Sequence, residues 1–78
     1  MTVEQIRQVI RAEPFKPFSL CVADGRQIRV EHPEFLALFP TGRAVVVTQP
    51  EDSYDILDLL LVTGVRVEDG KSGRTQQR

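Results

Sequence analysis

The sequence contains few of the residues that build covalent, metal or aromatic sites. Among its 78 residues there are one cysteine, one histidine, one tyrosine and no tryptophan. The single cysteine, Cys21, excludes an intrachain disulfide, and Cys21 together with His32 provides too few ligands for a zinc site. A chain of this length buries only a modest part of its surface on folding, so self-association is the remaining way to add stability.

Long apolar segments and glycine-rich motifs are also missing. No apolar run approaches the ~20 residues of a membrane-spanning helix, and the opening MTVEQIRQVIRAE lacks the apolar region of a secretory signal peptide. The five glycines are scattered and form no phosphate-binding loop. We therefore expect a cytoplasmic protein that does not bind a membrane, and nucleotide hydrolysis has no support.

The net charge is small but unevenly distributed. The chain has ten Lys and Arg and eleven Asp and Glu, which gives a formal net charge of -1 at pH 7. Residues 71–78 hold three of the basic residues and no acidic one, so residues 1–70 carry seven basic against eleven acidic residues. An acidic body argues against broad binding of a phosphate backbone, which depends on clustered Lys and Arg.

The N-terminal segment predicts an amphipathic helix. Thr2 and Gln5 have the spacing of a capping box, with Thr2 as the N-cap. Pro14 disfavours helical geometry at Glu13 and should end the helix there. One stripe of the helix is apolar and must pack on the rest of the protein; it is formed by Val3, Ile6, Val9 and Ile10.

The stretch ADGR separates two alternating runs, FSLCV and QIRVE, and predicts a β-hairpin. A two-residue turn would place Leu20 opposite Arg29 and mix apolar with polar side chains on each face. A three-residue loop over 23–25 places Leu20 opposite Ile28 instead, with Gly25 in the left-handed position of a bulged turn. The polar face, with Ser19, Cys21, Gln27, Arg29 and Glu31, should meet solvent or a partner.

Further strands are predicted over residues 44–48, 54–58 and 65–68. The valines of AVVVT favour a strand that is buried on both faces. FLALF, residues 35–39, is too short to distinguish a strand from a helical turn. Asp58 is expected to cap one tight turn over residues 59–62. Together these elements predict an α+β, mostly β, domain over residues 1–70, with an N-terminal helix and a small, roughly five-stranded antiparallel barrel, followed by a disordered basic tail over 71–78.

Two resemblances accompany this prediction. The order of helix, hairpin, central strand pair, tight turn and final strand over residues 2–68 is similar to the Sm-like and SH3-like small barrels. The motifs PFKPF, ADGR, HPEF, PTGR and DLLLV resemble those of a family of short uncharacterised bacterial proteins. The first resemblance implies binding of single-stranded RNA as one possible function, and the second implies no activity.

Catalysis and metal binding have little support in the residues. His32 lies beside Pro33 and is expected to stabilise a turn, while Cys21 lacks the basic neighbours that activate a thiol. The segment EDSYDILD is rich in carboxylates but lacks the ligand spacing of a calcium loop, so these carboxylates are expected to be solvated. We predict no catalytic residue, no cofactor and no metal site.

Two kinds of binding remain, and each has its candidate residues. RNA binding could use basic residues near one rim of the barrel and in the tail, namely Arg26, Arg29, Arg43, Lys71 and Arg74. Self-association or binding of an unidentified protein partner could use apolar residues in excess of what a small interior needs, namely Leu59, Leu60, Leu61, Val45 and Val47. We favour a non-catalytic, self-associating interaction or regulatory module, because the aromatic side chains on which RNA bases stack are scarce.

Overall fold

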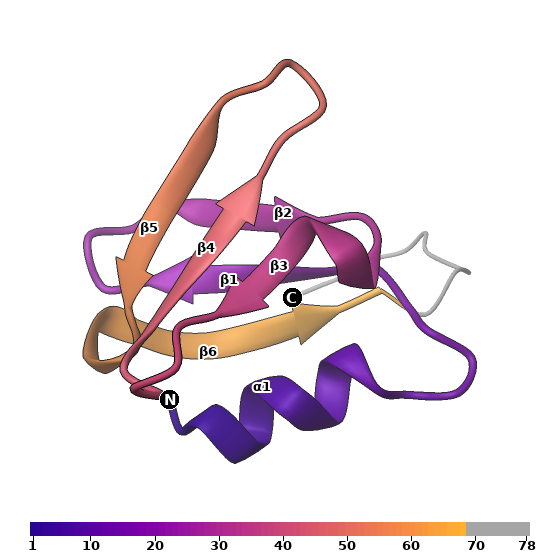
Figure 1. The fold of residues 1–78 in the computed structure, drawn as a ribbon, viewed down its shortest axis with the longest axis horizontal. Coiled ribbons are helices and arrows are strands. Elements are labelled where there is room, and N and C mark those ends of the chain that lie inside the picture. Colours follow the sequence, from indigo (N-terminus) through magenta and orange to yellow (C-terminus); the bar gives the residue numbers. More distant parts are fainter. Residues whose placement is uncertain (69–78) are drawn as a thin grey trace.

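The structure, a computed structural model, describes residues 1–68; the predicted tail over 71–78 lies outside the described residues. A single helix, α1 (Val3–Ile10), is followed by a series of short strands (Figure 1). In the described residues these strands are β1 (Phe18–Val22), β2 (Gln27–Val30), β3 (Leu36–Leu38), β4 (Ala44–Thr48), β5 (Tyr54–Asp58) and β6 (Val62–Val67). Single turns of 3-10 helix, η1 (Pro33–Phe35) and η2 (Leu59–Leu61), precede β3 and β6.

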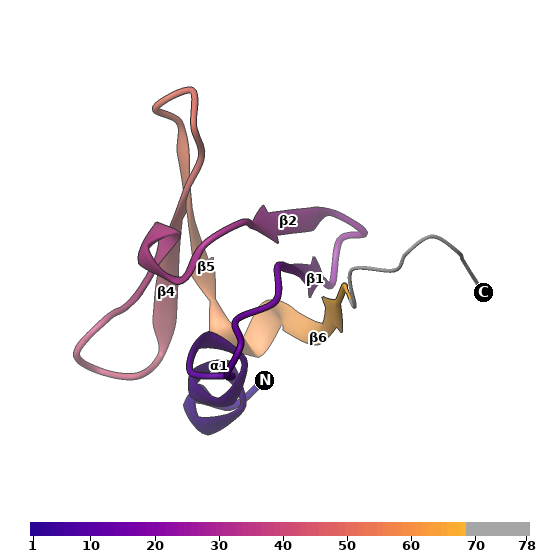
Figure 2. The same cartoon turned by 90° about the vertical axis from the view of Figure 1, so that its right-hand side faces the viewer.

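The strands form two antiparallel three-stranded sheets, ordered β2-β1-β6 and β3-β4-β5. Figure 2 shows the two sheets from the side, as separate layers with α1 below them. There are six strands in residues 1–68, where about five were predicted, because residues 35–39 divide between η1 and β3. No strand pairing joins the two sheets within residues 1–68. Pro33 explains the break after β2, since proline cannot donate to a strand ladder.

The register predicted for the first hairpin is confirmed. Leu20 pairs with Ile28 and Phe18 with Val30. Gly25 has a φ of 97° and donates its backbone N–H to the carbonyl of Val22 at 2.9 Å. Glycine is the residue that adopts this left-handed conformation without cost, so one residue fixes which side chains of β1 and β2 face the core.

The helix begins as predicted and ends earlier. The Gln5 backbone N–H donates to Thr2 Oγ1 at 3.2 Å, and the Thr2 N–H donates to Gln5 Oε1 at 2.9 Å, which completes the capping box. The helix ends at Ile10 rather than near Glu13, because the apolar stripe ends there and residues 11–13 are exposed. Among the described residues, no helix is long and apolar enough to cross a membrane.

The core lies between α1 and the two sheets. Its buried side chains are Ile6, Phe18, Leu20, Val22, Ile28, Val30, Leu36, Val45, Val47, Leu57, Leu59 and Val62. The prediction that β4 is buried on both faces is wrong: Val45 and Val47 are buried, whereas Val46 is half-buried and Thr48 is exposed. One face of β4 packs on the first sheet, and no described element covers the other (Figure 2).

Candidate interaction surface

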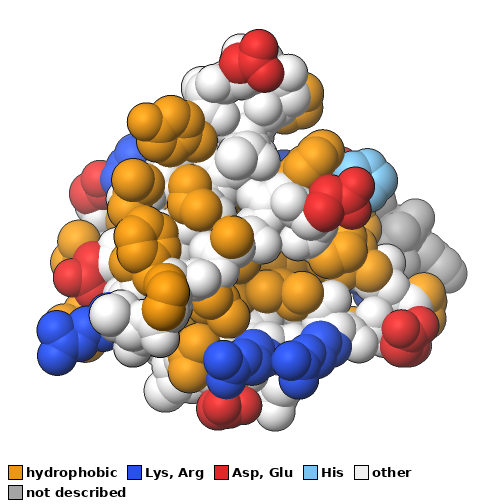
Figure 3. All heavy atoms as spheres, in the orientation of Figure 1, with side chains coloured by type: hydrophobic (Ala, Val, Ile, Leu, Met, Phe, Trp, Pro, Cys, Tyr) orange, Lys and Arg blue, Asp and Glu red, His pale blue; other side chains and the backbone are white. Residues whose placement is uncertain are grey.

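The second sheet, β3-β4-β5, turns an apolar face outward. Side chains alternate along a strand, so the neighbours of the buried Val45, Val47 and Leu57 point away from the core. Figure 3 shows hydrophobic side chains following β4 and β5 on this exposed side of the molecule. An antiparallel sheet with one solvated face normally carries polar side chains there, so this face is unusual.

Strand register aligns the apolar side chains into one continuous surface. Ala37 pairs with Val46, and Val46 pairs with Ile56, so one row crosses all three strands. Tyr54 lies two residues from Ile56 on the same face; Tyr54 is 64% exposed and Ile56 is 59% exposed. We call these four residues, Ala37, Val46, Tyr54 and Ile56, the apolar face.

The residues predicted for self-association divide into two groups. Val45, Val47 and Leu59 are buried and contribute to the chain's own core. Leu60 is 86% exposed and Leu61 is 53% exposed, so these two side chains are available to a partner. The predicted capping of this turn is confirmed, because Asp58 Oδ1 accepts a hydrogen bond from the Leu60 backbone N–H at 2.9 Å.

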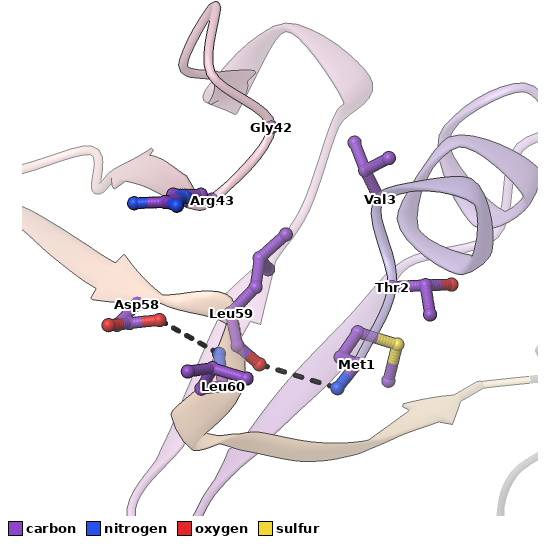
Figure 4. Close-up of a pocket in the computed structure, with 8 residues that line it drawn as sticks. All are labelled: Met1, Thr2, Val3, Gly42, Arg43, Asp58, Leu59 and Leu60. Atoms are coloured by element: carbon purple, nitrogen blue, oxygen red, sulfur yellow. Dashed lines mark hydrogen bonds between the residues drawn. The ribbon is translucent and has the colours of Figure 1, made fainter.

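A half-enclosed pocket of about 410 Å³ lies between this turn and the start of the helix (Figure 4). The Met1 ammonium donates to the backbone carbonyls of Leu59 at 3.3 Å and Val62 at 3.1 Å. Arg43 is the only basic side chain in its lining. The lining is otherwise largely apolar, with Thr2 and Asp58 as its other polar side chains.

Two of the arginines predicted to bind RNA are held by carboxylates. Arg26 Nε donates to Asp24 Oδ2 at 2.9 Å, and Arg26 Nη1 lies 3.8 Å from Asp55 Oδ1. The latter contact connects the first hairpin to the second sheet. A guanidinium already paired with carboxylates has less attraction for a phosphate.

Arg29 is held from both sides on the outer face of the first sheet. Its Nε donates to Glu31 Oε2 at 2.7 Å, and its Nη2 donates to Glu68 Oε1 at 2.8 Å. The hydrogen bonds that Arg29 donates to Glu68, followed by the one that it donates to Glu31, raise the pKa of Arg29. In return, hydrogen bonds from the Arg29 side chain lower the pKa of Glu68. Arg29 is thus built into a surface ion network.

Of the remaining predicted RNA contacts, Arg43 lies within the described residues. Arg43 is exposed and makes no ion pair within residues 1–68. Lys71 and Arg74 lie outside the described residues. The Asp24 carboxylate also accepts a hydrogen bond from the Arg26 backbone N–H, and this bond is the main cause of the lowered pKa of Asp24.

The residues weighed for catalysis lie apart from one another. The His32 ring packs edge-on against Phe35, with centroids 5.3 Å apart. Cys21 is a half-buried free thiol on the outer face of the first sheet. Within residues 1–68, no group of three His, Cys, Asp or Glu side chains could hold a metal ion.

Sequence analysis did not predict Tyr54 and Ile56 as surface residues. The pattern of YDILD gave no signal for this, because Tyr54 and Ile56 share one parity and alternation alone favours burial of that parity over the one with Asp55 and Leu57.

Comparison with known protein families, with curated proteins and with solved structures finds no match for this chain. The resemblance to a bacterial family therefore stays a prediction.

Proposed function

We propose that this protein is a non-catalytic, cytoplasmic interaction module that associates with itself through the second sheet. The apolar face carries this proposal, because Tyr54 and Ile56 are large, exposed and aligned with Val46 and Ala37 across three strands. Contiguous exposed apolar side chains mark interaction sites in soluble proteins. Tyrosine in particular is enriched at protein interfaces.

The finer assignment of the fold to the Sm-like and SH3-like small barrels belongs to the same proposal. The order of sheets, with a 3-10 turn between β5 and β6, supports it. The function does not require a closed barrel. It requires one packed and one uncovered face on the second sheet.

Association with protein is favoured over RNA by the state of the arginines. Arg26 and Arg29 are paired with acidic side chains, and affinity for a phosphate backbone rises with the number of Lys and Arg that can neutralise it. Retention on a polyanion resin that falls steeply with salt would favour the RNA alternative instead.

Light scattering over a dilution series tests the proposal. We expect the wild type to exceed the monomer mass of 8.8 kDa and to dissociate on dilution. Ile56→Lys places a charge in the apolar face and should give a monomer at concentrations where the wild type is assembled. Gln27→Lys adds the same charge at an exposed site of the first sheet and should behave as the wild type. A wild type that is monomeric at every concentration would contradict self-association.

A further inference from the structure

The strand β5 has one edge without a partner in residues 1–68. It pairs with β4 alone, at the margin of the second sheet. Two hydrogen bonds flank the strand and show which of its backbone groups face β4: Gln49 N–H to Ser53 carbonyl, and Leu59 N–H to Arg43 carbonyl, both 2.9 Å. The backbone N–H and carbonyl groups of Ser53 and Leu59 therefore point toward β4.

Alternation along the strand assigns the remaining residues. In an antiparallel ladder, every second residue directs its N–H and carbonyl to the same neighbour. Asp55 and Leu57 share the parity of Ser53 and face β4. Tyr54, Ile56 and Asp58 direct their backbone groups to the open edge, and the side chains of Tyr54 and Ile56 belong to the apolar face.

The other strand margins are less suited to pairing. The margins of the first sheet are β2 and β6, which carry Arg29 and Arg66 on their outward faces. β6 also has an irregular register at Cys21 and Val22 of β1. β3, the second margin of the second sheet, has three residues. Charged side chains, irregular register and short length all discourage edge pairing. β5 is longer than β3 and pairs regularly with β4, and its charged side chains, Asp55 and Asp58, leave the apolar Ile56 free at the centre of the strand.

We infer that a second copy of this chain occupies the β5 edge, antiparallel to it, with a two-fold axis through Ile56. This inference rests on the proposed self-association and adds strand pairing at the β5 edge to it; the apolar face itself stays accessible in the pair. Ile56 would pair with Ile56 of the other copy, and Tyr54 with Asp58 of the other copy. Each of these pairs would exchange both backbone hydrogen bonds.

Charge selects this register over its neighbours. Moving the axis to Asp55 would set two carboxylates directly opposite each other, which is destabilising. Moving the axis to Leu57 would set the apolar Ile56 opposite the carboxylate of Asp58. With the axis at Ile56, two apolar side chains meet on the outer face and no like charges are directly opposite each other; the pairing of Leu57 with Asp55 falls on the inner face.

The pairing also brings together complementary polar groups. Asp58 Oδ1 accepts from the Leu60 N–H, which leaves Oδ2 as an acceptor on an exposed residue. The Tyr54 hydroxyl of the other copy is a donor. The joined sheets would present two apolar faces as one surface, ordered β3-β4-β5 followed by the same strands of the second copy in reverse.

Disulfide trapping tests this geometry. In a Cys21→Ser background, Ile56→Cys places two thiols opposite each other, where Cα atoms of a hydrogen-bonded pair lie ~5.5 Å apart, within disulfide range. We expect a disulfide-linked dimer on mild oxidation. Tyr54→Cys is the matched control, because the two copies of residue 54 would be ~14 Å apart along the strands and should stay unlinked.

A mixed experiment leaves Ile56 intact. Chains carrying Tyr54→Cys and chains carrying Asp58→Cys should form linked heterodimers when combined, and neither should do so alone. Assembly by light scattering without linkage at Ile56→Cys or in the mixture would overturn the two-fold register while self-association stands. Efficient linkage of Tyr54→Cys with itself would also overturn it. Absence of assembly in the wild type would overturn both proposals.

Discussion

The outward faces of the two sheets differ in chemistry although both sheets contribute to one core. In the first sheet, register aligns Arg29, Ser19 and Arg66 in one row and Gln27, Cys21 and Gly64 in the next. In the second sheet, the corresponding row is Ala37, Val46 and Ile56. The first face has the composition of a surface in water, whereas the second has the composition of an interface.

This difference shows that burial of one face does not determine the other. Both sheets obey the alternation that an antiparallel sheet over a core requires. Only the first adds an ion network, with Arg29 between Glu31 and Glu68. The second sheet has apolar side chains at the centre of its outward face, with the polar Thr48 and Asp58 at the ends of β4 and β5. An apolar centre with a polar margin is expected where another polypeptide covers a surface.

The largest expected effect comes from removing a large, fully buried side chain of the core. Phe18 is fully buried, and Phe18→Ala should lower the free energy of unfolding by about 3–5 kcal/mol, a large part of the stability of a small domain. Urea denaturation followed by circular dichroism measures the loss. Ile56→Ala, on the apolar face, should cost the monomer less than about 1 kcal/mol. Equal losses would show that the second sheet is covered.

A smaller effect is expected at the bend that sets the first face. Gly25 has a φ of 97° and open space around its missing side chain, so Gly25→Ala should cost about 1–2 kcal/mol through backbone strain alone. Gly64 also has open space and lies in β6 without a left-handed φ. Gly64→Ala is therefore the matched control and should be neutral or slightly stabilising. Thermal unfolding measures the change in Tm for both variants. Equal changes would contradict the role assigned to the left-handed conformation of Gly25.

The smallest effect concerns the ion network of the first face at acid pH. Hydrogen bonds from Arg29 lower the pKa of Glu68 in the folded state. The resulting stability is present above the unfolded pKa, near ~4.3, and is lost as pH falls through the lowered folded pKa. Glu68→Gln should therefore reduce the loss of stability on acidification below about pH 5.

The control for this prediction is Glu34→Gln, since Glu34 makes no ion pair in the described residues. The urea midpoint is measured at neutral and at acid pH. For Glu34→Gln, its change with pH should equal that of the wild type. If Glu68→Gln had no effect either, the contact with Arg29 would contribute nothing in solution.

Local patterns predicted the elements better than the surfaces. The register around Gly25 and the cap at Asp58 follow from neighbouring residues, and both are confirmed. The division of FLALF between a turn and a strand depends on its pairing with β4, which lies later in the chain. The contact of Arg29 with Glu68 joins residues 39 positions apart and leaves no trace in a local pattern.

The apolar face was missed for a related reason. Alternation shows which side chains of AVVVT and YDILD share a face, but it does not show whether another layer covers that face. Five apolar or small residues in a row fit both a central and a half-exposed strand. The number of layers depends on the whole chain. The described part of this chain has too few elements to cover both faces of the second sheet.

The three-residue length of β3 determines where growth of the sheet would stop. Joining two copies through β5 leaves β3 at each outer rim, preceded by a turn and too short to recruit a further strand with useful affinity. Growth of this sheet by strand pairing would thus end at two copies instead of continuing into fibrils.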